Sequence, residues 1–204
     1  MTNKPIQKFI KRQVDFIIAL LSLVILSPLF FVVAFLIKID SKGPVFFLQK
    51  RPGKDAKLFT VIKFRTMVDG AEKFGLDLNK DNPRITRFGR FLRRWHIDEL
   101  PQLINILLSQ MSLVGPRPPM ISQVNIENKF EQKRFLVKPG LTGWAQIHGG
   151  NLLSWEERVK YDVLYVKNYS VWLDLKIFLI SVWKIILLGR DLYKEKENKG
   201  NKYE

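Results

Sequence analysis

Residues 24–33, "VILSPLFFVV", place a serine and a proline in the middle of a long apolar run. From Phe16 to Ile37 the chain carries no charged side chain. As a straight helix that stretch would reach about 33 Å, roughly the thickness of the hydrocarbon core of a bilayer. The run is therefore long enough to cross a membrane. No small-residue cleavage site of the A-x-A kind follows it, which argues against a signal peptide.

Both ends of this run carry the same positive charge. Lys4, Lys8, Lys11 and Arg12 precede it, and Lys38, Lys42, Lys50 and Arg51 follow it. The positive-inside rule favours the cytoplasmic side for both flanks. Pro28 must kink a helix, because it lacks an N–H and clashes with the preceding turn, and Ser27 can hydrogen-bond a carbonyl that the kink frees. These features predict a re-entrant helix that breaks at Ser27-Pro28, although most apolar segments of this length simply span the bilayer, so both topologies stay open.

Composition limits the partners. The chain has 204 residues, 47% of them hydrophobic, which is enough for one modest globular domain with a membrane element. Lys and Arg outnumber Asp and Glu by 34 to 19, and the net charge of +15 indicates an anionic partner such as nucleic acid, lipid headgroups or a phosphorylated small molecule. Cysteine is absent, which excludes a disulfide framework and thiolate chemistry.

Beyond residue 40 the pattern predicts a mostly helical α+β fold. "PVFFLQKRPG" and "KLFTVIKFRTM" indicate a β-hairpin around "PGKDAK", and Pro101 is positioned to open a helix. The segment "VWLDLKIFLISVWKIILLGR" is helical, and suits either the membrane interface or a buried position. We expect a re-entrant membrane anchor at 1–40, a globular domain at 41–190 and a charged, disordered tail at 191–204.

The candidate chemistry centres on "HIDELPQ". Asp98 and Glu99 are adjacent carboxylates, which can hold a divalent cation or supply a nucleophile for phosphorus. As acids at the start of a helix, they could instead be ordinary capping residues. The surrounding sequence is rich in cations, and arginine forks fit phosphate oxygens. These cations are Lys63, Arg65, Arg84, Arg87, Arg90, Arg93, Arg94 and Arg117.

Six motifs, in order along nearly the whole chain, resemble those of the bacterial sugar transferases, and specifically the small monotopic phosphoglycosyl transferases. The motifs are "KRQVDFIIALLSLVILSPLF", "GPVFFLQKRPG", "FTVIKFRTM", "GRFLRRWHIDELPQLINILLSQMSLVGPRP", "VKPGLTGWAQIHG" and "YDVLYVKNYSVWLDLKI". The resemblance implies transfer of a phospho-sugar from a UDP-sugar to polyprenyl (undecaprenyl) phosphate, with release of UMP, as the first membrane step of bacterial glycoconjugate assembly. It also implies a re-entrant helix broken at Ser27-Pro28, with 41–190 as the catalytic domain.

The same resemblance assigns roles to individual residues. Asp98 would attack the β-phosphorus and form a phosphosugar-aspartyl intermediate, and Asp98 and Glu99 would hold Mg²⁺. Lys63, Arg93, Arg117 and Asp174 match polar positions around the phosphates and the metal. The expected location is the bacterial inner membrane, in contact with its lipids and with the active site on the cytoplasmic face.

Alternatives from two classes remain at this stage. A basic membrane-surface scaffold or a nucleic-acid-binding module would use the charge without catalysis, although no helix-turn-helix, zinc or ribonucleoprotein motif is present and we expect no nucleic-acid partner. An enzyme could also use polyprenyl phosphate directly as the nucleophile. The sequence does not identify the sugar, and an exposed last helix could support a homodimer.

Overall fold

The computed structural model describes residues 5–71, 82–125 and 127–188. The helices are α1 (Pro5–Asp40), α2 (Arg87–Arg94), α3 (Gln102–Leu107), α4 (Trp144–Ile147), α5 (Trp155–Lys167) and α6 (Val171–Leu188). The strands are β1 (Phe46–Pro52), β2 (Leu58–Phe64), β3 (Ser112–Val114) and β4 (Gly140–Thr142). Short 3₁₀ turns η1 (Lys54–Ala56), η3 (Ile97–Glu99), η4 (Ile121–Gln123), η5 (Glu131–Leu136) and η6 (Gly150–Leu152) connect them. The fold is mostly helical α+β, as predicted, and the predicted tail 191–204 lies outside the described residues.

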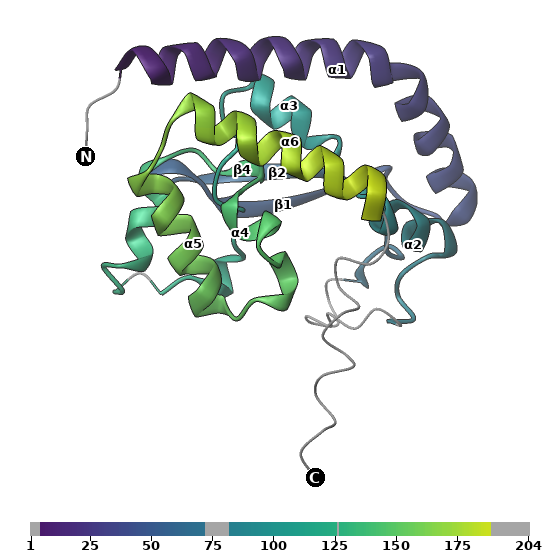
Figure 1. Ribbon diagram of the computed structural model, residues 1–204. Coiled ribbons are helices and arrows are strands. Elements are labelled where there is room, and N and C mark those ends of the chain that lie inside the picture. The colour runs from purple at the N-terminus through teal and green to yellow at the C-terminus, as the bar shows by residue number, and fades with distance from the viewer. Residues whose placement is uncertain (1–4, 72–81, 126, 189–204) are drawn as a thin grey trace.

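Helix α1 is continuous but bent, so the break predicted at Ser27-Pro28 is instead a bend within one helix. It runs across the top of the domain and then turns down its side (Figure 1). Pro28 lies inside the helix, and its missing N–H leaves the carbonyl of Val24, four residues back, without a helical partner. The Ser27 hydroxyl donates to that carbonyl at 2.8 Å, as the sequence predicts. The Ser27-Pro28 pair therefore bends the helix while keeping this carbonyl hydrogen-bonded.

The apolar surface of α1 is largely exposed. Val24, Ile25 and Phe31 are 65, 73 and 79% exposed. Within the described part of the chain, α1 is the one helix long and apolar enough to cross a membrane, judged by length and composition. A helix at the core of a soluble domain would bury these side chains, so the exposed apolar surface is consistent with membrane association.

The N-terminal part of α1 is fixed to the domain by polar contacts. The guanidinium of Arg12 donates to the carbonyls of Ile106 and Leu107, at 2.7 and 2.9 Å, and so satisfies the C-terminal end of α3. The buried carboxylate of Asp15 accepts hydrogen bonds from the Ser112 hydroxyl and from the backbone N–H of Leu113. Because one buried partner without the other would be costly, these contacts fix the position of α1 on β3.

The C-terminal part of α1 packs on the same domain through apolar side chains. Val33 and Ile37 form a cluster with Phe64 of β2 and Leu92 of α2. The carboxylate of Asp40 accepts a hydrogen bond from the first turn of α2. Both halves of the bent helix are therefore held against one globular body.

The predicted hairpin is confirmed. β1 and β2 pair antiparallel, from Phe46 opposite Phe64 to Pro52 opposite Leu58. Side chains alternate between the two faces of such a ribbon, and directly opposed residues share a face. Arg51 lies opposite Phe59, and Lys63 lies opposite Phe47, so both cations project from the same face.

A second, parallel pairing joins β3 to β4, which are far apart in the sequence. The backbones of Gly115 and Gly140 approach so closely that a Cβ on Gly140 would overlap Gly115. Gly115 N–H donates to Thr142 at 2.9 Å, and Gly140 N–H donates to Pro116 at 2.9 Å. These bonds fix the chain just before Arg117.

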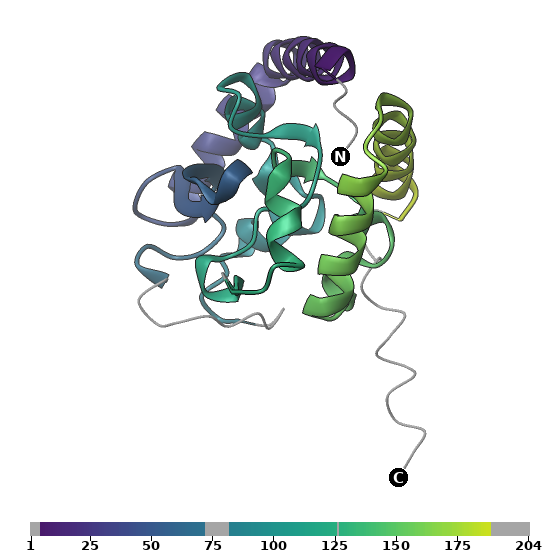
Figure 2. The ribbon, with the colours of Figure 1, turned by 90° about the vertical axis from the view of Figure 1, so that its left-hand side faces the viewer.

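Helix α6 buries one side and exposes an apolar one. Ile177 is fully buried in the main core, whereas Trp172 and Trp183 are 80 and 64% exposed. Both views place α1 and α6 at the same end of the molecule (Figures 1 and 2). Helix α6 therefore has a packed side, in line with the predicted buried position, and an open apolar side, for which the membrane interface stays a prediction.

Candidate active site

The acidic pair lies in a tight turn between two short helices. Asp98 and Glu99 belong to η3, which follows α2 and precedes Pro101 at the start of α3. His96 adopts the left-handed conformation, with φ of 55°, and its carbonyl accepts the Glu99 N–H at 3.2 Å. Because α3 has only six residues, its dipole contributes little here. The charge that balances the acids comes from side chains.

Glu99 is held by two cations. One of its oxygens accepts from Lys63 at 2.7 Å and from Arg117 at 2.5 Å, and its other oxygen accepts a second bond from Arg117 at 2.9 Å. The side chain is buried, which by itself would raise the pKa of the carboxyl. Arg117 and Lys63 outweigh that effect and hold the pKa of Glu99 well below its ordinary value. Glu99 is therefore a fixed anion.

Asp98 has the opposite character. Burial, and next the neighbouring charge of Glu99, raise the pKa of Asp98 to about 6, against the influence of Lys63, Arg93 and Arg117. In the part of the chain that the structure describes, no hydrogen bond or ion pair engages its carboxylate. Two adjacent carboxylates thus differ sharply, one locked by cations and one available, which is a pattern typical of functional sites.

Arg93 completes the group on the Asp98 side. Its Nε donates to the Thr66 hydroxyl at 2.8 Å, and its charge acts on Asp98. Burial lowers the pKa of Arg93, and Asp98 partly opposes this. The structure therefore brings together Lys63, Arg93, Arg117, Asp98 and Glu99, five of the residues singled out in the sequence.

Asp174 lies in a different cluster. Its carboxylate accepts from Lys11 of α1 at 2.7 Å and from the Tyr165 hydroxyl at 2.6 Å. Lys11 and Tyr165 also donate to the carbonyl of Val114. These contacts join α1, α5, α6 and β3, so the observed partners of Asp174 are structural ones, and its predicted substrate contact stays a prediction.

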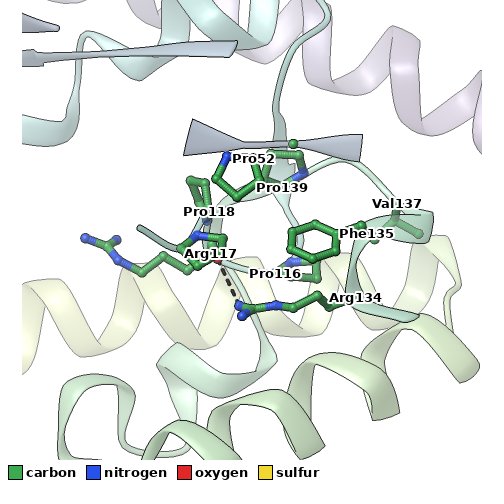
Figure 3. Close-up of a pocket in the computed structure, with 10 residues that line it drawn as sticks. Pro52, Pro116, Arg117, Pro118, Arg134, Phe135, Val137 and Pro139 are labelled. Carbon is green, nitrogen blue, oxygen red and sulfur yellow. Dashed lines mark hydrogen bonds between the residues drawn. The ribbon is translucent and has the colours of Figure 1, made fainter. Parts of the chain in front are cut away.

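The turn that carries Arg117 is supported from beneath by Arg134 (Figure 3). The guanidinium of Arg134 donates to the Arg117 carbonyl at 3.1 Å and to the carboxylate of Asp162 at 2.6 Å, and lies over the ring of Trp155. The Arg117 side chain points away from this contact. Asp162 is buried together with Arg134, which lies 28 residues away in the sequence.

Breaking this buried ion pair should destabilise the domain. In Arg134→Leu, the Asp162 carboxylate would stay buried without its partner, a loss of about 3–5 kcal/mol that corresponds to a fall in melting temperature of roughly 10 °C. The double variant Arg134→Leu/Asp162→Leu should recover most of the loss. Thermal unfolding in detergent, followed by tryptophan fluorescence, measures both. Equal melting temperatures for wild type and Arg134→Leu would contradict this assignment.

The acidic pair has too few carboxylates to bind a magnesium ion alone, and it fits the ion only together with a bound phosphate group. Among the described residues, no three His, Cys, Asp or Glu side chains gather in one place. Mg²⁺ is commonly bound through one or two carboxylates together with waters and substrate phosphates. Asp98 and Glu99 supply that number of carboxylates: no described residue hydrogen-bonds the oxygens of Asp98, and the oxygens of Glu99, which already accept three hydrogen bonds, keep room for one further contact.

Arg51 was missed as a site residue, because the sequence shows it only as one of the charges that flank the apolar run. Its guanidinium contacts Gln49 and the carbonyl of Pro118, next to Arg117. Burial and the like charge of Arg117 lower the pKa of Arg51 to about 10. The alternation of the predicted hairpin could have placed it on the face of Lys63.

This chain belongs to the bacterial sugar transferase family, whose family model matches residues 6–187. It is 43% identical over 178 residues to the uncharacterized sugar transferase EpsL of Bacillus subtilis, covering 87% of this chain and 88% of that protein. It is 42% identical over 192 residues to the UDP-N-acetylgalactosamine-undecaprenyl-phosphate N-acetylgalactosaminephosphotransferase of Aeromonas hydrophila, covering 91 and 45%. It is 40% identical over 188 residues to the UDP-glucose:undecaprenyl-phosphate glucose-1-phosphate transferase of Escherichia coli, covering 88 and 40%. The chain thus spans most of the first relative and less than half of the other two.

Proposed function

We propose that this chain is a phosphoglycosyl transferase that moves a sugar 1-phosphate from a UDP-sugar to undecaprenyl phosphate. The products are undecaprenyl-diphosphate-sugar and UMP. The observation that carries the proposal is the contrast between the available Asp98 and the locked Glu99 inside a group of cations. The named activities of the relatives from Aeromonas hydrophila and Escherichia coli agree with it.

In the first step an oxygen of Asp98 attacks the β-phosphorus of the donor. A bond forms between that oxygen and phosphorus, and the bond from phosphorus to the bridging oxygen breaks, so that UMP leaves with the electron pair. Asp98 suits this role because its oxygens are available, whereas those of Glu99 are bonded to Lys63 and Arg117. The reaction gives a phosphosugar-aspartyl intermediate.

In the second step a phosphate oxygen of undecaprenyl phosphate attacks the same phosphorus, and Asp98 is released as a carboxylate. Lys63, Arg93 and Arg117 offset the repulsion between the anionic nucleophiles and the diphosphate. Asp98 and Glu99 would hold Mg²⁺ with the donor phosphates, and a bound Mg²⁺ ion would supply further neutralisation of the phosphate charge. Glu99 also keeps Lys63 and Arg117 in position.

The experiment that tests this function is release of UMP by the membrane-reconstituted protein. Undecaprenyl phosphate, Mg²⁺ and a panel of UDP-sugars are supplied, and lipid-linked product is followed in parallel. We expect UMP and lipid-linked product from one or a few donors. No UMP from any donor would favour the scaffold alternative.

The rate of the first step should fall at acid pH. With a pKa of about 6, Asp98 is ionised and nucleophilic above pH 6 and protonated below it. The rate of the UMP burst without acceptor should therefore decrease below pH 6, approaching tenfold per pH unit. Leaving out undecaprenyl phosphate removes the titration of its phosphate from the measurement. A burst rate that is constant from pH 8 to pH 5 would contradict the assignment.

We also propose that α1 is re-entrant and places the site at the cytoplasmic face of the inner membrane, in contact with its lipids. The polar contacts of Arg12 and Asp15 and the apolar contacts of Val33 and Ile37 support this, because both halves of the helix bind the same globular body. A straight span would separate its two ends by the full bilayer thickness.

Cysteine accessibility should distinguish the two topologies. The native chain has no cysteine. Lys8→Cys introduces one exposed thiol before the apolar run, and Lys42→Cys introduces one after it. In intact spheroplasts, a membrane-impermeant maleimide should label neither variant, and lysis should make both reactive. Labelling of one variant before lysis would indicate a spanning helix instead.

A further inference from the structure

A partly open hollow lies beside Lys63 and Arg117, the two cations that bind Glu99. It is lined by Arg51, Val61, Lys63, Gln102, Arg117 and Pro118. Three of these six residues are cations, and Glu99, the acid that Lys63 and Arg117 share, is a single negative charge. Arg51 donates to neutral acceptors, the Gln49 amide and the Pro118 carbonyl. The hollow therefore has an excess of positive charge.

Gln102 adds a second, independent indication of a ligand. Its side chain is 2% exposed, yet its amide nitrogen has no hydrogen-bond partner among the residues that the structure describes. The nearby buried amide of Asn105 is fully used, since it bonds to Ile62, Thr60 and Gln110. An unpaired buried donor destabilises the folded chain, so an acceptor beside Gln102, from water or from a ligand, would stabilise it.

The position of the hollow relates it to the reacting groups. The charges of Lys63, Arg93 and Arg117 all lower the pKa of Asp98. Of these three residues, Lys63 and Arg117 also line the hollow, and Arg93 does not. A diphosphate whose β-phosphorus faces Asp98 can thus extend its other phosphate toward Arg51 and Gln102. The group at that end is the leaving group, on which negative charge develops as the bridging bond breaks.

We propose that Arg51 and Gln102 form the subsite for the phosphate of the leaving nucleoside monophosphate. This inference rests on the proposed function, because it assumes a nucleoside diphosphate-sugar donor. Arg51 donates to the phosphate from the hairpin side, and the amide nitrogen of Gln102 donates from the α3 side. Both bonds strengthen as the phosphate becomes more negative, so the subsite favours departure of UMP as well as binding.

The test uses Gln102→Leu and Arg51→Gln in the full chain, with UMP as the probe. We expect each variant to weaken UMP binding, measured by calorimetry, and to slow the burst of UMP from the donor, each by about tenfold or more. The KM for undecaprenyl phosphate should stay within twofold of wild type. Gln123→Leu, the same change on an exposed turn, is the matched control and should match wild type.

Stability separates this role from a structural one. Because Gln102→Leu removes an unpaired buried donor, the ligand-free variant should melt at the same temperature as wild type or a few degrees higher. A marked fall in melting temperature would indicate that Gln102 is a packing residue and would overturn the subsite.

Two other outcomes would also overturn it. Unchanged UMP affinity with a raised KM for undecaprenyl phosphate would assign the hollow to the acceptor, and no change in either would mean that it holds water only. These results differ from failure of the proposed function, in which the wild-type chain itself releases no UMP from any donor.

Discussion

Asp98→Asn should abolish transfer of the sugar phosphate, lowering UMP release by roughly 10³-fold or more while leaving UDP-sugar binding in place. Asparagine has nearly the same shape but lacks the anionic oxygen that forms the bond to phosphorus. The group of Lys63, Arg93 and Arg117 would remain, and it would lose one of the two acids that it balances. Donor affinity should therefore be equal or higher. Turnover and calorimetric binding of the donor measure the two effects separately.

The same variant should be more stable than wild type at alkaline pH. The pKa of Asp98 is raised in the folded chain, so the ionised form is disfavoured on folding. That penalty is absent below the ordinary value of 3.8 and complete above about pH 6. The Asp98→Asn variant lacks this penalty. Its free energy of unfolding should exceed that of wild type by about 1–3 kcal/mol at pH 8 and by almost nothing near pH 4.

A matched control is Asp55→Asn, which changes an exposed acid in the hairpin turn and should alter neither turnover nor stability. Substantial UMP release by Asp98→Asn would rule out Asp98 as the nucleophile. An inactive Asp98→Asn protein with a lower melting temperature at pH 8 would point to misfolding rather than to loss of chemistry.

Glu99→Gln should produce the second largest loss, about 10²–10³-fold in kcat/KM, through a different cause. Its carboxylate accepts three hydrogen bonds from Lys63 and Arg117. A glutamine side chain would place an amide N–H donor where the carboxylate has an acceptor, and it carries no negative charge. The positive charges of Lys63 and Arg117 would then face each other without an anion between them. Both cations should move from the position where they meet the donor phosphates, and the Mg²⁺ concentration for half-maximal activity should rise.

Stability should also fall in Glu99→Gln, by about 1–3 kcal/mol, less than for a fully buried pair because Arg117 is partly exposed. Glu156→Gln, an exposed acid at the start of α5, provides the control and should retain kcat/KM. If Glu99→Gln kept wild-type activity and Mg²⁺ dependence, the role of Glu99 in holding the cations would be wrong.

Local patterns predicted the parts of the fold that local forces decide. The hairpin follows from alternation around a turn, and the Ser27 bond to Val24 follows from the chemistry of proline. Parallel pairing of β3 with β4 could not be predicted, because each strand has only three residues and the pairing depends on close backbone approach at Gly115 and Gly140. The left-handed conformation of His96, just before the turn that carries Asp98, leaves no mark in the periodicity of the sequence.

The residues of the candidate site also divide into those that the sequence predicted and those that only the fold reveals. The family motifs pointed to Asp98, Glu99 and the cations that surround them in the fold. The elements that carry these residues are short and lie next to one another. Asp174 has its observed partner Lys11 on α1, at the opposite end of the described chain, so only the docking of α1 reveals that contact. Gln102 carries no signal in the sequence, because an unpaired buried donor exists only in the folded structure.

The most direct test of the central claim is the mass of the protein after incubation with a UDP-sugar and Mg²⁺ without acceptor. We predict one equivalent of UMP and a mass gain of one sugar phosphate on the peptide that contains Asp98, discharged when undecaprenyl phosphate is added. Release of UMP only in the presence of acceptor, with no mass gain on the protein, would contradict the account and indicate direct attack by undecaprenyl phosphate.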